Sequence, residues 1–152
     1  MSNTSKRSAV LNEAYKNKKI LNKISEILND VLEDNKKIKC SPEVSEHHKR
    51  LAFYSTIPAS VSIGGYIERI TKYTHCEEST LISALIYIDR MCEINNIYLM
   101  QGNIHRIVFT CIILAIKYNE DDYYTNNYYS KVGGIIVKEF NLLEYELLTP
   151  DL

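Results

Sequence analysis

Apolar side chains recur at helical spacing in the first third of the chain. Between Ala14 and Glu33, an apolar residue returns every three or four positions. These residues are Ile20, Ile24, Ile27 and Val31, with Leu21, Leu28 and Leu32 beside them. Lysine, asparagine, glutamate and aspartate fill most other positions. The spacing predicts an amphipathic helix over residues 14–34, which must pack its apolar side against another part of the protein.

The segments on either side of this helix lack such a pattern. Residues 1–13 are mostly polar, and we expect them to be disordered. Residues 35–52 begin with a polar, lysine-containing stretch and contain Pro42, which is typical of a linker. The remainder, residues 53–152, is predicted to form one compact helical domain.

The first two helices of that domain are marked by the residues at their starts. Ser62 is suited to cap a helix over residues 63–73, and Gly64 in its first turn can allow close packing. Acidic Glu77 suits the start of a second helix that ends near Ile94. The positions expected to face inward are Ile63, Ile67 and Ile70 in the first helix, and Leu81, Leu85, Ile88 and Cys92 in the second.

The next segment, residues 104–118, contains the run 107–116, which is apolar almost all round. A helix without a polar face is surrounded by other elements, so we expect this one at the centre, with Asn103 as its cap. A short helix over residues 128–132 follows, and then a last helix over residues 137–148. The residues of the last helix expected to face inward are Phe140, Leu143 and Leu147. The pattern therefore predicts an all-α fold around a buried central helix.

Composition excludes several classes of function. The 152 residues carry 18 basic and 19 acidic side chains, a net charge of −1, whereas general nucleic-acid binders carry a basic excess. The longest apolar run is Ile112–Ile116, and even the wider stretch 104–116, which contains His105 and Arg106, is far shorter than the ~20 residues of a membrane span. The chain start shows no apolar run like a secretion signal, and the four cysteines form no CxxC pair. We therefore expect an intracellular protein (cytoplasmic, nuclear or both) that binds neither nucleic acid nor membrane.

No group of residues has the spacing of a catalytic or metal site. His75 adjoins Cys76, but neighbours in sequence point apart. Cys40 lacks the spacing to His47 and His48 that a zinc site needs. The chain contains no glycine-rich phosphate loop. We therefore expect no enzyme activity, no cofactor, no metal and no small-molecule substrate.

Three charged residues lie among apolar positions in the first two helices of the domain. Arg69 stands beside Ile70, and Asp89 and Arg90 directly follow Ile88. A buried carboxylate needs a cationic partner, so Asp89 could pair with Arg69 or Arg90 and fix the two helices together. Alternatively, all three side chains reach solvent. The sequence leaves both alternatives open.

Two further charges stand at the ends of apolar runs. Lys117 ends the central helix, and Glu144 lies on the last helix between Leu143 and Tyr145. If these two helices pack side by side, the two charges can approach one another near a surface edge. By itself this would be an exposed ion pair worth roughly 0–1 kcal/mol.

Several short motifs, in order along the chain, resemble a cyclin box. They are Pro58-Ala59-Ser60-Val61-Ser62-Ile63, Tyr66-Ile67-Glu68-Arg69-Ile70, Tyr87-Ile88-Asp89-Arg90, Asn103-Ile104-His105-Arg106, Leu114-Ala115-Ile116-Lys117-Tyr118, Lys131-Val132-Gly133-Gly134 and Asn141-Leu142-Leu143-Glu144. The His-Arg, Lys-Val-Gly-Gly and Asn-x-x-Glu elements are similar to the P/U-type cyclins, a single-box group linked to phosphate signalling. The resemblance covers about residues 53–148.

The resemblance implies a cyclin-box bundle of five helices around a buried third helix, preceded here by the additional N-terminal amphipathic helix. It also implies a function, that of a non-catalytic activating subunit of a cyclin-dependent protein kinase in cell-cycle or phosphate signalling. In cyclins, a lysine and a glutamate hold the backbone that leads into the C-helix of the kinase, and the matching residues are Lys117 and Glu144. Tyr118 and Glu120 match positions that often touch the kinase.

Two other functions remain open. General transcription factors also use cyclin-like folds, and a degenerate cyclin could be a helical adaptor that activates no kinase. The near-neutral charge speaks against the first, and the presence of both Lys117 and Glu144 speaks against the second. The chain ends at Leu152, where cyclins continue into apolar residues that pack on the kinase.

Overall fold

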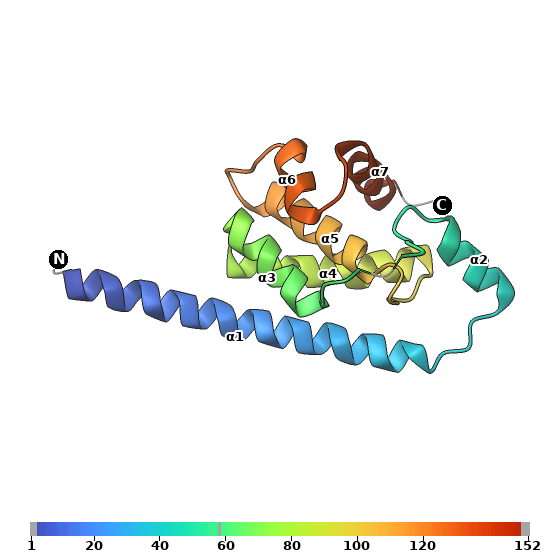
Figure 1. The fold of residues 1–152 in the computed structure, drawn as a ribbon, viewed down its shortest axis with the longest axis horizontal. Coiled ribbons are helices and arrows are strands. Elements are labelled where there is room, and N and C mark those ends of the chain that lie inside the picture. The colour runs from blue at the N-terminus through green and yellow to red at the C-terminus, as the bar shows by residue number, and fades with distance from the viewer. Residues whose placement is uncertain (1–2, 58, 150–152) are drawn as a thin grey trace.

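The computed structural model describes residues 3–57 and 59–149, with side chains from residue 18 onward. All regular structure in this part of the chain is helical (Figure 1). The helices are α1 (Asn3–Lys36), α2 (Pro42–Arg50), α3 (Ile63–Thr74), α4 (Glu78–Asn95), α5 (Ile104–Asn119), α6 (Asn126–Gly133) and α7 (Val137–Leu148). The predicted all-α fold is confirmed.

Helix α5 lies at the centre of the domain. All its side chains from Ile107 to Ile113 are buried, and Ile104, Phe109 and Ile113 have no exposed surface. Helix α4 runs along it, α3 and α7 pack on other sides, and α6 lies between α3 and α7 (Figure 1). The prediction that this mostly apolar segment forms a buried central helix is therefore confirmed.

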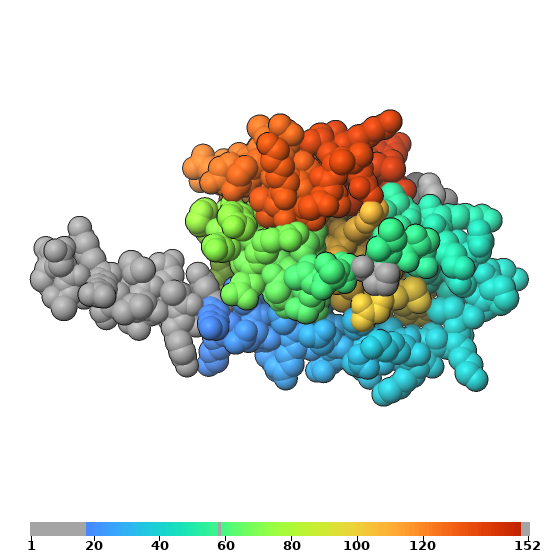
Figure 2. All heavy atoms as spheres, in the orientation of Figure 1, coloured from blue at the N-terminus to red at the C-terminus, as the bar shows by residue number. Residues whose placement is uncertain are grey.

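The long helix α1 covers the layer formed by α3 and α4 (Figures 1 and 2). Its buried residues are Ile24, Leu28 and Leu32, whereas Ile27 and Val31 remain 40% and 37% exposed. The side of α1 that packs on the domain is thus rotated from the predicted isoleucine and valine positions toward Leu28 and Leu32. At the closest approach, a Cβ atom on Gly64 would lie 3.2 Å from Ser25 Oγ, so the glycine allows the close packing that was expected.

Two predictions for the N-terminal third are wrong. Helix α1 begins at Asn3, where disorder was expected over residues 1–13; residues 1–2 lie outside the described range. The helix extends this far because no glycine or proline interrupts it after its start. Between α1 and the domain, the expected linker 35–52 contains helix α2.

Helix α2 starts with a well-formed cap. The backbone N–H of Val44 donates to Ser41 Oγ at 3.3 Å, and Pro42 occupies the first turn, where its missing N–H costs nothing. His48 is buried, and its Nε2 accepts the backbone N–H of Tyr98 at 2.8 Å. This side chain fixes α2 to the loop before α5.

The two predicted caps of the domain differ in outcome. Ser62 caps α3 as expected, since its Oγ accepts the backbone N–H of Gly65 at 3.1 Å. Asn103 stands at the N-cap position of α5 but makes no cap hydrogen bond. Its side chain instead accepts the N–H of Met100 at 2.8 Å and donates to the carbonyl of Tyr98 at 2.9 Å. Asn103 therefore organises the loop before the helix.

Replacing Ser62 with alanine should lower the free energy of unfolding by about 1 kcal/mol, because one N–H at the start of α3 loses its acceptor. Chemical denaturation of the purified protein measures this change. The matched control is Ser79→Ala, since Ser79 is an exposed serine in the first turn of α4. An equal effect of both substitutions would contradict the capping role.

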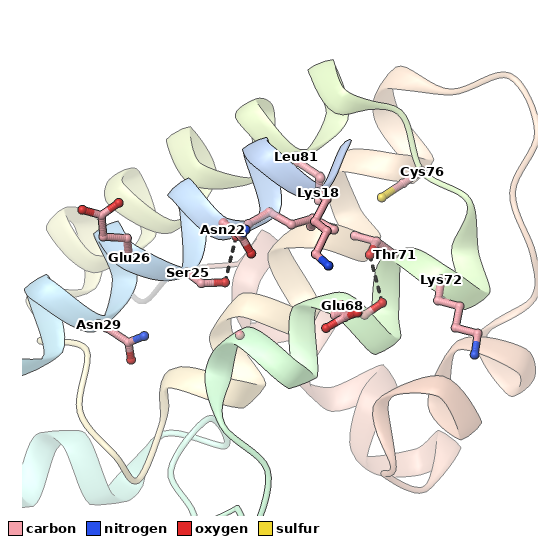
Figure 3. A pocket seen from close by; sticks show the side chains of 12 residues that line it. Lys18, Asn22, Ser25, Glu26, Asn29, Glu68, Thr71, Lys72, Cys76 and Leu81 are labelled. Atoms are coloured by element: carbon pink, nitrogen blue, oxygen red, sulfur yellow. Dashed lines mark hydrogen bonds between the residues drawn. The ribbon is translucent and has the colours of Figure 1, made fainter. Parts of the chain in front are cut away.

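A hollow of about 700 Å³, lined by both polar and apolar residues, lies between α1 and α3. Figure 3 shows Lys18, Asn22 and Ser25 from α1 facing Glu68 and Thr71 from α3. Ser25 Oγ donates to its own helix, at 2.8 Å from the carbonyl of Leu21. The hollow mixes both signs of charge.

Candidate functional site

Lys117 and Glu144 meet at the edge of the helical domain. Lys117 stands in the last turn of α5 and Glu144 on α7, and Lys117 Nζ lies 2.6 Å from Glu144 Oε1. The approach that the sequence suggested is therefore present. The two side chains keep 23% and 15% of their surface exposed, so the pair is mostly desolvated but still reaches solvent.

Asn126, at the start of α6, completes this group. Lys117 Nζ donates to Asn126 Oδ1 at 2.5 Å, and Asn126 Nδ2 donates to Glu144 Oε2 at 2.7 Å and to Asn141 Oδ1 at 2.9 Å. The amide thus holds both charged groups and ties three helices together. Sequence reasoning missed this role, since nothing in the local pattern shows that the start of α6 adjoins the end of α5.

The pair retains hydrogen-bonding capacity for another molecule. An ammonium group has three N–H donors, of which Lys117 uses two, for Asn126 and Glu144. Each oxygen of the Glu144 carboxylate accepts one hydrogen bond and keeps a free lone pair. One donor and two acceptor positions therefore remain. A peptide backbone, with its N–H and C=O groups, has the matching chemistry.

The other two predicted contact residues differ in their placement. Tyr118 follows Lys117 and is 72% exposed, so its ring is available to a partner. Glu120 is half-buried near Thr80 and the backbone of Glu77, at the start of α4. Burial raises the pKa of the Glu120 carboxyl, although Thr80 and the Glu77 backbone lower it in part. Whether either residue touches a partner stays a prediction.

The ion pair suggested for Asp89 is absent. Asp89 and Arg90 are exposed on the outer side of α4, and within residues 18–57 and 59–149 no ion pair includes either of them or Arg69. Water solvates these two groups, so they need no partner. Arg69 is half-buried, with its guanidinium carbon 5.0 Å from the centre of the Tyr66 ring.

The His-Arg motif at the start of α5 makes structural contacts. Arg106 Nη1 lies 2.5 Å from Glu139 Oε1 on α7 and donates to the carbonyl of Ala52 at 3.0 Å. His105 Nε2 donates to the carbonyl of Val61 at 2.7 Å. The bonds to Ala52 and Val61 fix the segment before α3 to the central helix, and the bond to Glu139 fixes α7 to it. The sequence pattern gave no sign of the Arg106–Glu139 pair, which joins positions far apart in the chain.

The described residues contain no group of three or more histidine, cysteine, aspartate or glutamate side chains able to hold a metal ion. Nor does this part of the chain contain a helix long and apolar enough to cross a membrane. Burial raises the pKa of the Cys76 thiol to about 11 and that of Cys92 to about 12. Both thiols therefore stay protonated near neutral pH and are weak nucleophiles.

Comparison with known proteins agrees with these features. The family model described as Cyclin matches residues 6–150. Cyclin-U4-2 of Arabidopsis thaliana is 36% identical over 130 residues, which cover 85% of this chain and 59% of that protein. Cyclin-P3-1 of Oryza sativa subsp. japonica is 35% identical over 120 residues, which cover 79% of this chain and 48% of that protein. The chain thus spans between about half and three fifths of these relatives, and it belongs to the cyclin family, among the P/U-type cyclins.

Proposed function

We propose that this cyclin is the activating subunit of a cyclin-dependent protein kinase, and that it holds the kinase through Lys117 and Glu144. The contact between these two side chains carries the proposal. The pair lies at a surface edge, is mostly desolvated, and offers donors and acceptors that the protein itself leaves unused. Its relatives bear cyclin names, which supports the same assignment.

Activation by such a subunit is a shift between two kinase states. An active kinase needs an ion pair between a lysine and a glutamate of its C-helix, which positions the phosphates of ATP. A partner that binds only the state with this helix turned inward stabilises it by the difference in affinity. Moving the population from 1:99 to 99:1 takes about 5.5 kcal/mol.

The pair can supply part of this energy at the start of the C-helix. The first N–H groups of a helix and the chain leading into it lack internal partners. The Glu144 carboxylate can accept such N–H groups, and the Lys117 ammonium can donate to a carbonyl of the same segment. Hydrogen bonds with one charged member contribute about 1.5–3 kcal/mol each, more than neutral ones. Contact with the exposed ring of Tyr118 adds apolar area.

The test is recovery of a kinase from the source cell, followed by reconstitution. The chain is immobilised, the captured kinase catalytic subunit is identified and purified, and phosphate transfer to a peptide is measured as the chain is added. We expect saturable activation at a 1:1 ratio. Capture of no kinase, or binding without activation, would contradict the activating role and favour an adaptor.

Asn126 should act as a positioning residue for the pair. Replacing it with alanine removes the bonds to both charged groups, so Lys117 and Glu144 lose their fixed orientation. We expect kinase affinity to fall about tenfold, as for one net hydrogen bond to a charged group. Asn127→Ala, at the neighbouring exposed position, is the matched control. Unchanged affinity for Asn126→Ala would show that the pair needs no such support.

A further inference from the structure

A second hollow, of about 310 Å³, lies beside the first turn of α5, whereas Lys117 lies in the last turn of that helix. Its wall comes from the segment before α3, from α3 itself, from the start of α5 and from the end of α6. The charged and titratable side chains among its lining residues are Arg69, His105, Arg106 and Tyr66. Among the described residues, no aspartate or glutamate lines it. The volume is at the lower end of the range for ligand pockets, ~300–1,000 Å³.

Only one of the two guanidinium groups has an anionic partner. Arg106 is paired with Glu139. For Arg69, the described part of the chain offers no ion pair, and its Nε is buried without any hydrogen-bond partner. A charge that is partly desolvated and has no counter-ion is costly, so a half-buried arginine in this state would be stabilised by an external anion.

Tyr66 does not supply the missing negative charge. The Arg69 guanidinium carbon lies 5.0 Å from the centre of the ring, a favourable cation–π contact. The phenol, however, donates its proton to the carbonyl of Gly133 at 2.7 Å. Burial raises the pKa of Tyr66 to about 12, even though nearby Arg69 and Arg106 lower it. The ring therefore stays neutral and leaves the arginine charge uncompensated.

His105 contributes a second unpaired atom to the same wall. Its ring centre lies 5.2 Å from that of Tyr66, and its Nε2–H donates to the carbonyl of Val61. The other ring nitrogen, Nδ1, is buried and has no hydrogen-bond partner in the described part of the chain. Burial lowers the pKa of His105, so the ring is neutral and Nδ1 carries a lone pair. Two residues that line the hollow, Arg69 and His105, thus each have one buried nitrogen without a hydrogen-bond partner among the described residues, the first a cationic donor and the second a neutral acceptor.

We propose that this hollow binds a phosphate group, either free or as the monoester of a serine or threonine side chain. Phosphate oxygens match the Arg69 guanidinium in charge and geometry. A phosphate monoanion, which persists as a fraction near neutral pH because the second pKa is near 6, keeps one P–OH group that can donate to His105 Nδ1. A carboxylate has acceptor oxygens only, and would leave that nitrogen unpaired.

Gly134 keeps the arginine accessible on one side. A Cβ atom at this position would lie 3.4 Å from Arg69 Nη2, and the backbone there has φ of +72°. Glycine is thus required by the turn after α6, and its missing side chain leaves space beside the guanidinium. This proposal does not depend on the kinase proposal, because the hollow is formed by the chain alone.

Calorimetric titration of the purified chain tests the site with defined probes. Inorganic phosphate represents the free anion, and N-acetyl-O-phosphoserine amide represents the monoester. N-acetylserine amide and acetate are the uncharged and carboxylate controls. We expect at least one phosphate probe to bind, and Arg69→Gln to weaken that binding about tenfold or more. Arg90→Gln, at an exposed arginine of α4, should leave it unchanged.

The pattern of binding identifies the source of the phosphate. Binding of N-acetyl-O-phosphoserine amide but not of inorganic phosphate assigns a phosphorylated protein as the ligand. Binding of inorganic phosphate but not of the phosphoserine amide assigns the free anion. Nuclear magnetic resonance of the unsubstituted protein decides the matter even if Arg69→Gln does not fold, since a bound phosphate should shift the His105 ring protons. No binding of either phosphate, equal binding of acetate, or binding without a change at His105 would overturn the proposal.

Discussion

Replacing Lys117 with alanine should lower kinase affinity by about 30-fold to several thousand-fold, which corresponds to about 2–5 kcal/mol for truncating one member of a desolvated charge pair. The substitution removes the donor that faces the partner backbone. It also leaves the Glu144 carboxylate, 15% exposed, with Asn126 as its remaining side-chain partner from the pair's own group. Equilibrium binding to the purified kinase subunit measures the effect. Lys138→Ala, at an exposed lysine of α7, is the matched control.

A double-mutant cycle separates binding from folding. Lys117→Ala and Glu144→Ala each leave one charge without its partner, so each should lower the unfolding free energy. The double variant leaves no charge unpaired, and its stability should recover part of that loss. Kinase binding should nevertheless stay lost in all three variants. If affinity followed stability instead, or if both single variants bound like the original protein, the pair would be a structural contact only.

The core of the fold was predictable from the sequence because its central element has an unusual composition. The nearly uninterrupted apolar run over residues 107–116 favours a helix surrounded by others. A local signal was equally reliable where a single side chain caps a helix, as Ser62 does at the start of α3. The same reasoning was wrong for Asn103, because its side-chain amide bonds the backbone of Met100 and Tyr98 in the preceding loop and does not bond the helix.

Contacts between distant segments account for most of what sequence reasoning missed. The approach of Lys117 to Glu144 followed from two helices lying side by side, and family resemblance pointed to the same residues. Asn126 comes from a third element, and its position depends on how α6 packs. For Asp89 the sequence left an ion pair and solvent exposure both open, because position beside an apolar run does not show which side of α4 faces water.

The N-terminal third shows a different limit. Composition suggested a linker at residues 35–52, yet the Ser41–Pro42 pair is a start signal for a helix, and α2 begins there. Its stability in the fold comes from His48, a polar residue buried against the loop before α5. A histidine that gains a backbone partner 50 positions away cannot be recognised as a core residue from its neighbours in sequence.

Replacing Phe109 with alanine should lower the free energy of unfolding by about 3–5 kcal/mol, as for other fully buried phenylalanines. The ring has no exposed surface, and its centre lies 5.0 Å from that of Phe140 and 6.4 Å from that of Tyr66. Small domains have only about 5–15 kcal/mol in total, so thermal unfolding should begin near physiological temperature. Tyr118→Ala, at an exposed aromatic residue of the same helix, should change stability by less than about 0.5 kcal/mol.

Substitution of Gly133, which faces the Phe109 ring, tests how tightly the core is packed. A Cβ atom on Gly133 would lie 2.6 Å from Phe109 Cζ, closer than two carbon atoms can approach without movement. Gly133→Ala should therefore cost about 1–3 kcal/mol from overpacking, although alanine favours the helix by about 1 kcal/mol. In a Phe109→Leu background the ring edge is gone, so the added methyl group should become neutral or stabilising. Additive effects of the two substitutions in urea denaturation would show that α6 moves away from α5 to make room, and that the contact is not rigid.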